Sequence, residues 1–494
     1  MQSAKRKVQN VGSETLLYND INDNTVGKTL NYSSFIIRFF QGVTDTNRYS
    51  LDMTKGPWLK KILIFSLPLM LTGLLQMVYN TADIVVVGRF AGPASLAAVG
   101  ATSSLIHLIL NIFWGTAMGS GVMSARYIGA EDNDRLSKSV HTAMLLSIVC
   151  GIAVGFFGIS MAEKLLILMD TPADVLPLAK IYLQIYFTGA PASLVYNFGA
   201  AIVRSTGDTQ RPLYILTGTG LVNIALNLVL VINFHLDVAG VAIATITAQY
   251  ISAVLIVVRL LKIEGACRLH LKKLRFHKDE LKRILLIGVP AGVQNSLFSL
   301  SNVIIQTTVN SFGSVAMSGI SASSNIDAVI YTCTNAISQT TMTFTSQNMG
   351  AHKHENLGKI YSRCLILTTV LGGGLCVVSY IFRNQLLGIF STEPDVIAAG
   401  AQRLAVILPF HVFCSLMDVG GGQLRGMGRS FEPMFITLMG SCGLRLLWVF
   451  VFFPKNPTLL YLYQAYPISW TITFAVLFVF YFITKRNIIK KKEL

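Results

Sequence analysis

The sequence predicts an all-α integral membrane protein with twelve transmembrane helices in two six-helix lobes, related by a pseudo-twofold axis along the membrane normal. Three observations predict this fold. The 494 residues are 52% hydrophobic and only 13% charged, apolar stretches of membrane-spanning length recur along the chain, and the second half repeats the first. Soluble proteins carry about 25% charged residues. A soluble enzyme or a nucleic-acid-binding protein is therefore disfavoured, despite the net charge of +16.

Twelve apolar stretches are long enough to cross a membrane. A helix needs about 20 residues to span the hydrocarbon core, and glycine and proline are tolerated inside such helices where neighbouring helices satisfy the backbone. We expect the first six spans near residues 62–88, 97–124, 140–161, 176–203, 212–233 and 239–261. The second six are expected near residues 284–312, 319–346, 361–382, 396–423, 433–453 and 463–483.

Basic residues gather in alternate loops and orient the spans. The densest group follows the sixth span and comprises Arg259, Lys262, Arg268, Lys272, Lys273, Arg275, Lys278, Lys282 and Arg283. Cytoplasmic loops carry an excess of lysine and arginine, so both termini are expected in the cytoplasm. The predicted organisation is a polar, disordered tail (1–54), a first lobe (55–262), a basic cytoplasmic linker (263–283), a second lobe (284–485) and a basic tail (486–494). Met53 is an alternative natural start, because it leads directly into the first span.

The two halves of the chain repeat each other. A constant shift in residue number pairs Gly129 with Gly350, Arg204 with Arg425 and Gly207 with Gly428. Near the first span, a shift longer by a single position pairs Pro68 with Pro290. Each half has six spans, an even number, so both halves enter the membrane from the same side. We therefore expect two lobes that flank a central cleft, as in a transporter whose lobes rock to open the cleft to each side alternately.

Several segments carry a family resemblance. They are Leu67-Pro68-Leu69, Tyr79-Asn80-Thr81-Ala82-Asp83, Val87-Gly88-Arg89-Phe90, Gly129-Ala130, Arg204-Ser205-Thr206-Gly207-Asp208-Thr209 and Leu424-Arg425-Gly426-Met427-Gly428. With them the sequence resembles the multidrug and toxic compound extrusion (MATE) family over about residues 55–485. The resemblance implies an antiporter, not an enzyme, that exports amphipathic, often cationic, drugs or toxic organic compounds against an inward flow of Na⁺ or H⁺.

These expectations extend to location and partners. We expect a multi-pass protein of the plasma membrane, specifically a bacterial inner membrane. Its partners would be the organic substrates, the coupling cation and the lipid bilayer, with no nucleic acid and no obligate protein partner. No cofactor is expected apart from a possible bound Na⁺.

Asp83 is the candidate residue for cation coupling. It is the only carboxylate deep in the first lobe, and a charged side chain inside a span costs about 2.5–3.5 kcal/mol on insertion scales, which makes it a functional candidate. Gln76 and Asn80 share its helical face. Further oxygen atoms that suit Na⁺ or a proton relay come from Asn197, Asn223, Asn227 and Thr245.

The family resemblance supports these residues as a cation site, but one of them departs from the family pattern. The positions resemble the cation site that some MATE branches hold in the first lobe, although Asn227 stands where such branches often have a second carboxylate. In the alternative interpretation, Asp83 is solvated near the outer end of its span and each asparagine serves helix packing.

The second lobe does not duplicate this site, because Leu444 and Trp448 occupy the positions equivalent to Asn223 and Asn227. Candidates for the substrate cleft are Gln76 in the first lobe and Asn295, Asn302, Gln306 and Asp418 in the second. An acid and a base inside the membrane usually pair, so we predict a structural ion pair between Asp418 and Arg445. Alternatively, Asp418 binds cationic substrates or a second proton, and Asp327 is open to the same alternatives.

The sequence supports two other function classes less well. A flippase for lipid-linked or amphipathic metabolites uses a similar lobed bundle, but such flippases often present several cationic residues to the cleft, and Arg445 alone is available here. A membrane-embedded enzyme lacks support, since the sequence has no Walker or HExxH motif and no GxSxG motif with plausible partners. Cation-coupled export is the predicted function, with the flippase as the alternative.

Overall fold

The computed structural model describes residues 51–493, which fold into helices without a strand. The first repeat contains α2 (Trp58–Phe90), α3 (Gly92–Gly129), α4 (Asn133–Leu168), α5 (Leu176–Thr188), α6 (Ala190–Ser205), α7 (Gln210–Leu228) and α8 (Asp237–Lys262). The second contains α9 (Lys278–Asn310), α10 (Ser314–Gly350), α11 (Glu355–Ile381), α12 (Arg383–Gly388), α13 (Pro394–Gly426), α14 (Phe431–Thr437), α15 (Leu444–Leu447), α16 (Leu459–Tyr463) and α17 (Ala465–Glu493). The predicted tail lies outside the described residues, apart from residues 51–54.

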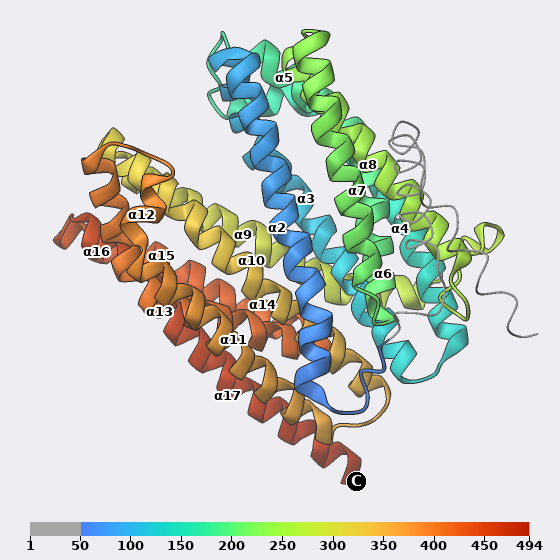
Figure 1. The fold of residues 1–494 in the computed structure, drawn as a ribbon. Coiled ribbons are helices and arrows are strands. Elements are labelled where there is room, and N and C mark those ends of the chain that lie inside the picture. Colours follow the sequence, from blue (N-terminus) through green and yellow to red (C-terminus); the bar gives the residue numbers. More distant parts are fainter. Residues whose placement is uncertain (1–50, 494) are drawn as a thin grey trace, which may run out of the picture. The chain divides into compact units, whose positions relative to one another are not determined.

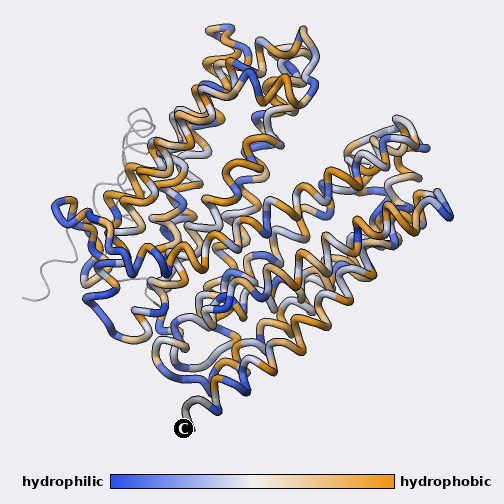
Figure 2. Tube along the Cα trace, turned by 180° about the vertical axis from the view of Figure 1, so that it is seen from behind, coloured by the Kyte–Doolittle hydropathy of each residue, from blue (hydrophilic) through white to orange (hydrophobic). Residues whose placement is uncertain are grey.

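The structure agrees with the predicted membrane fold. Ten of the helical segments between residues 51 and 493 are long and apolar enough to cross a bilayer. The predicted fourth span corresponds to α5 and α6, which are separated at Gly189, and the predicted eighth span corresponds to α10, whose polar residues lower its hydropathy. Figure 1 shows α2–α8 and α9–α17 as two bundles, and Figure 2 shows that hydrophilic residues gather at the helix ends.

Short π-helical segments interrupt the predicted fifth and eleventh spans, which are equivalent in the repeat. In the fifth span, Val229–Asn233 follows α7 directly. In the eleventh span, Leu438–Gly443 and Trp448–Phe452 flank the single turn of α15. π-Helical turns are rare and often occur at functional sites, which directs attention to the polar residues beside them.

The first helix of each repeat packs partly in the other repeat. We call the end of the bundle where α2 begins and α17 ends the basic end. Near this end, Ile62 and Phe65 of α2 belong to a hydrophobic core built with Phe344 and other residues of the second repeat. Farther along the same helix, Val86 and Val87 belong to a core of the first repeat. The helix α2 therefore joins the two lobes.

The helix α9 crosses in the equivalent way. A Cβ atom on its Gly288 or Gly292 would collide with the backbone of α3, so the two helices lie backbone against backbone in the basic half. Its far half, with Ile305 and Val309, packs in a core of the second repeat. Small residues allow such close approach between membrane helices. Bulkier residues, Ser66 and Met70, occupy the equivalent positions of α2.

The pseudo-twofold axis passes between α3 and α10 at the basic end. A Cβ on Gly129 would collide with the carbonyl of Gln347, and a Cβ on Gly350 would collide with the carbonyl of Arg126. Gln347 is the repeat equivalent of Arg126, as Gly350 is of Gly129, so the two contacts are the same contact made twice. Reciprocal contacts of this kind are the signature of a twofold relation. The geometry agrees with the parallel repeat deduced from the sequence.

Hydrogen bonds between the repeats also concentrate in the basic half. Gln347 Nε2 donates to the Ser205 carbonyl at 2.8 Å, and Tyr127 Oη donates to Glu280 Oε2 at 2.6 Å. Those farthest from the basic end are the bond from Ser296 Oγ to the carbonyl of Leu108 and the bond from Thr332 Oγ1 to Met77 Sδ. Beyond these residues, the described part of the chain shows no hydrogen bond or ion pair between the repeats. The lobes are thus held together at one end.

We predict that Gly350→Ala destabilises the protein. The added methyl group would meet the Arg126 carbonyl, and overpacking of this kind typically costs about 1–3 kcal/mol. The matched control is Gly374→Ala in the middle of α11, where a Cβ meets no atom within 4 Å. Thermal unfolding in detergent measures the melting temperature of each variant. Equal melting temperatures for the two variants would contradict the close approach of α3 and α10.

Candidate functional site

Asp83 lies in a polar cluster built from three helices of the first lobe. Its Oδ1 accepts a hydrogen bond from Asn227 Nδ2 of α7, and its Oδ2 accepts one from Thr245 Oγ1 of α8 at 3.5 Å. Asn223 Nδ2 donates to Thr245 Oγ1 at 3.4 Å, and Asn227 Nδ2 lies 3.5 Å from Asn223 Oδ1. Four of the residues predicted for cation coupling therefore meet at one place.

The cluster is rich in oxygen and partly buried, since Asp83 and Thr245 keep some exposure to solvent. Asn227 is fully buried and Asn223 is 5% exposed. The Oδ1 atom of Asn227 is buried and has no hydrogen-bond partner among the described residues. Carboxylate, amide and hydroxyl oxygens of this kind can hold a proton or a hard cation.

Local sequence explains how the cluster forms. Asn223 and Asn227 are four residues apart, so they project from one face of α7. The π-helical segment Val229–Asn233 begins two residues after Asn227. On the opposing helix, the ring of Tyr79 occupies the space left by the missing side chain of Gly220, and its hydroxyl donates to the Thr217 carbonyl at 3.3 Å. This contact seats the far half of α2 against α7.

Two residues predicted for cation coupling lie outside this cluster. Asn197 Nδ2 donates to the carbonyl of Ser193 in its own helix at 2.8 Å, so this bond does not join two helices. Asn80 is exposed and makes no side-chain hydrogen bond within residues 51–493. Gln76, which shares its helical face, is also exposed. Both side chains are free to contact a solute.

Three predicted cleft residues lie on α9, namely Asn295, Asn302 and Gln306, and one of them contacts a buried arginine. Asn302 Oδ1 accepts a hydrogen bond from Arg445 Nη1 at 3.1 Å. Gln306 Nε2 donates to Asn310 Oδ1 at 3.1 Å, and Asn295 is exposed. Asn302 is itself exposed, so it contacts the buried Arg445 from an accessible position, and Asn295 is exposed as well.

Arg445 is fully buried and surrounded by aromatic rings. Its guanidinium carbon lies 4.4 Å from the ring centroid of Tyr466, 5.0 Å from that of Phe298 and 5.5 Å from that of Trp470. Its Nε donates to Ser469 Oγ at 3.2 Å. Aromatic faces stabilise a desolvated cation by about 2 kcal/mol or more, so rings and hydroxyl and amide oxygens take the place of a carboxylate.

The predicted ion pair between Asp418 and Arg445 is wrong. Asp418 instead accepts a hydrogen bond from the hydroxyl of Tyr331 and interacts electrostatically with Arg425. The reason is depth. Asp418 lies about two helical turns from Gly426, where α13 ends at the basic end, whereas Arg445 lies about four turns from Phe431, where α14 begins there. With a rise of 1.5 Å for each residue, the two side chains are about 9 Å apart in depth.

The intramembrane ion pair of the second lobe is Asp327–Arg403. Arg403 Nη1 lies 2.7 Å from Asp327 Oδ2, with 8% of the arginine side chain and 16% of the aspartate side chain exposed. The same arginine nitrogen donates to Ser323 Oγ at 2.9 Å. Asp327 is as far along the chain from Gly350, the end of α10, as Arg403 is from Gly426, the end of α13, so both are at the same depth. Sequence reasoning missed Arg403, although depth matching within the predicted spans would have found it.

The repeated arginine motif also contributes contacts that the sequence did not predict. Arg204 Nη1 donates to Gln339 Oε1 of the other lobe at 3.1 Å. Its repeat equivalent, Arg425, donates through Nη2 to Gln294 Oε1 of α9 at 2.7 Å. The contact of Arg204 joins the two repeats, whereas that of Arg425 links α13 to α9 within the second repeat.

Comparison with known proteins identifies the fold. The MatE family model matches residues 68–229 and 290–451, two segments of equal length that occupy corresponding places in the two halves. The chain belongs to the MATE family of membrane transporters. The double match coincides with the repeat found in the sequence and confirms the resemblance, and it places the Asp83 cluster within a multi-pass membrane transporter.

Two curated relatives from Bacillus subtilis are named as probable multidrug resistance proteins. YoeA is 25% identical over 86% of this chain and 94% of its own length, and YpnP is 27% identical over 80% of this chain and 88% of its own. A solved structure, described as the outward-facing conformation of a multidrug resistance MATE family transporter, has a TM-score of 0.83 at 20% identity and covers 90% of this chain and all of that one. The chain thus combines membership of the MATE family with the fold of that solved transporter.

We predict that Asp327→Asn lowers the thermal stability and folded yield. Removal of one partner leaves Arg403 as an uncompensated buried charge, which costs about 3–5 kcal/mol, whereas removal of both partners is milder. The double variant Asp327→Asn/Arg403→Gln should therefore recover part of the loss. Asp418→Asn, which breaks no ion pair within 4 Å, serves as the matched control. Losses that simply add in the double variant would contradict the pairing.

Proposed function

We propose that this MATE protein is an antiporter that exports amphipathic, often cationic, organic compounds in exchange for Na⁺ or H⁺. Membership of the family supplies the transporter class, and the names of the relatives support organic substrates. The observation that carries the coupling proposal is the cluster of Asp83 with Asn223, Asn227 and Thr245. Asp83 is a partly buried carboxylate in a span, without a cationic partner within 4 Å among the described residues.

The chemistry of the cluster suits a coupling cation. A carboxylate inside a low-dielectric span has a high free energy as a bare charge, and binding of a proton or Na⁺ neutralises it. Thr245 and the two asparagines hold the carboxylate in place through hydrogen bonds. The unpartnered Oδ1 of Asn227 offers one further oxygen ligand to Na⁺. The same donor set serves either ion, so the proposal covers both.

The arrangement of the lobes supports alternating access. The contacts between repeats lie in the basic half, and the cluster lies in the far half of α2. If the basic end faces the cytoplasm, as the loop charges predict, this arrangement corresponds to a state that is closed to the cytoplasm. The exposed Gln76, Asn80 and Asn295 are then candidates for contact with the exported compound.

We predict that Asp83→Asn abolishes gradient-driven export while the protein still folds and binds substrate. Asparagine keeps the shape and most hydrogen bonds of aspartate but removes the titratable charge that makes the states depend on ion occupancy. Export is measured in proteoliposomes with an imposed pH or Na⁺ gradient and a fluorescent cationic dye. Substrate binding is measured as dye binding to the protein in detergent. We further expect Asn227→Asp to shift the pH or Na⁺ dependence.

The matched control is Asp174→Asn, an exposed acid in the loop before α5. It should export dye at the wild-type rate. Export by Asp83→Asn at that same rate would place the coupling site elsewhere.

We also predict that the basic end faces the cytoplasm. In a Cys150→Ala background, which removes the one native thiol that is not buried in the described residues, a cysteine introduced at the exposed position Lys273 should not react with a membrane-impermeant maleimide in intact cells. Lys455→Cys, exposed at the opposite end, should react. Labelling of the first variant but not the second would reverse the orientation.

A further inference from the structure

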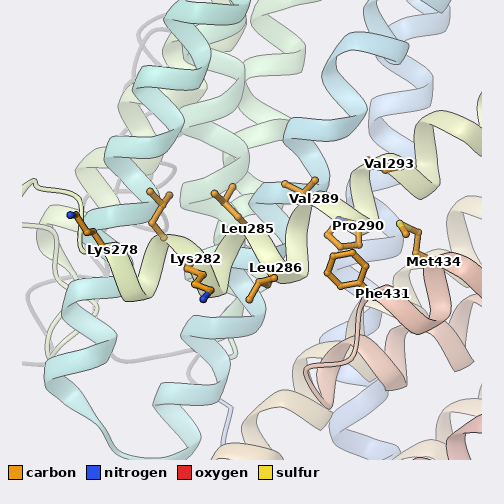
Figure 3. Close-up of a pocket in the computed structure, with 10 residues that line it drawn as sticks. Lys278, Lys282, Leu285, Leu286, Val289, Pro290, Val293, Phe431 and Met434 are labelled. Atoms are coloured by element: carbon orange, nitrogen blue, oxygen red, sulfur yellow. The ribbon is translucent and has the colours of Figure 1, made fainter.

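An apolar groove of about 610 Å³ runs along the surface of α9 where this helix meets α14 (Figure 3). Its lining comprises Lys278, Leu281, Lys282, Leu285, Leu286, Val289, Pro290 and Val293 from α9, and Phe431 and Met434 from α14. In Figure 3 the two lysines lie at one end, and Pro290 and the two α14 residues lie toward the other. None of these residues belongs to the Asp83 cluster.

The groove has the dimensions of a lipid chain. Its α9 residues recur at intervals of three and four, which places them on one helical face. From Leu281 to Val293 the helix rises about 18 Å, close to the ~15 Å depth of one hydrocarbon leaflet. Leu286 is 46% exposed and Phe431 is 48% exposed. Large apolar side chains so exposed on a membrane-spanning segment face lipid.

The polar end of the groove is positively charged. Lys278, Lys282 and the neighbouring Arg283 are exposed and form no ion pair with the described residues. The nearby acids are largely engaged: Glu280 accepts from Tyr127, and Glu432 pairs with Arg429 at 3.0 Å. Asp279 alone remains exposed among the cations. The net charge therefore favours an anion at this end and an apolar chain along the rest.

We propose that the groove binds an anionic phospholipid of the leaflet at the basic end. Its headgroup phosphate accepts hydrogen bonds from the ammonium groups of Lys278 and Lys282, whose alkyl stems extend along the apolar wall. One acyl chain lies against Leu285, Leu286 and Val289. Basic pockets between membrane helices on the cytoplasmic side are suited to anionic headgroups.

The position of the groove links this lipid to the closed basic end. The wall formed by α9 packs on α3 of the first lobe through Gly288 and Gly292. The wall formed by α14 belongs to the second lobe. Ser430 Oγ, just before α14, donates to the Ile287 carbonyl of α9 at 2.7 Å. A lipid that bridges both walls stabilises this packing. The inference goes beyond the proposed transport function, because lipid binding is measured without transport.

Native mass spectrometry of the full-length protein tests the proposal. The protein in detergent is mixed with equal amounts of phosphatidylglycerol and phosphatidylcholine, and the retained lipid is counted. We expect phosphatidylglycerol to be retained preferentially. Lys278→Gln/Lys282→Gln should lower that preference about five- to 25-fold, since each lysine near an anionic surface contributes about a factor of five. A wild-type protein without the preference would overturn the proposal.

Two matched variants separate the groove from general surface charge. Lys272→Gln/Lys273→Gln removes two exposed lysines of the linker outside the groove and should leave the preference unchanged. An equal loss in both double variants would overturn the site. Leu286→Trp fills the groove without any change of charge and should lower retention of phosphatidylglycerol. Unchanged retention in that variant would show that the chain lies elsewhere.

Discussion

The backbone contact between α3 and α10 at Gly129 and Gly350 is the constraint on which the rest of the structure depends. It is made twice, once in each direction across the pseudo-twofold axis, and it holds the basic halves of the two lobes together. The close packing of α9 on α3, the exchange of α2 into the second core and the arginine contacts at Gln339 and Gln294 all lie on the same side of the membrane helices. The far halves are left without hydrogen bonds between repeats in the described residues.

Although the two lobes are related by symmetry, they surround charged side chains inside the membrane with different neighbours. The first lobe keeps a carboxylate, Asp83, among neutral hydrogen-bond donors, whereas the second keeps a cation, Arg445, among aromatic rings and neutral acceptors. Two carboxylates of the second lobe have a cation near them: Asp327 is paired with Arg403, and Asp418 interacts electrostatically with Arg425. A group without a countercharge is the one whose free energy an ion can change most. The asymmetry therefore favours the first lobe as the site of coupling.

Much of the architecture could be predicted from the sequence, because hydropathy, loop charge and the repeat are local or periodic signals. Part of the site followed too, since the four-residue spacing of Asn223 and Asn227 fixes their common face. Contacts between side chains on different helices could not in general be predicted from the sequence, since they depend on the rotation and depth of each helix. The choice of Arg445 for Asp418 ignored depth, whereas equal depth pairs Asp327 with Arg403. That Asn197 bonds within its own helix and Asn80 stays exposed depends on rotation, which hydropathy does not give.

For the proposed coupling, helix α2 offers a direct connection from an ion in the first lobe to the second lobe. Its far half carries Asp83 and is seated on α7 by the ring of Tyr79 against Gly220. Its basic half is part of the second lobe's core through Ile62 and Phe65. If the hydrogen bonds from α7 and α8 to Asp83 change, the change acts on α2, whose other half is packed in the second lobe. The proposed coupling would not require a long chain of contacts, because a single continuous helix connects the carboxylate to the opposite lobe.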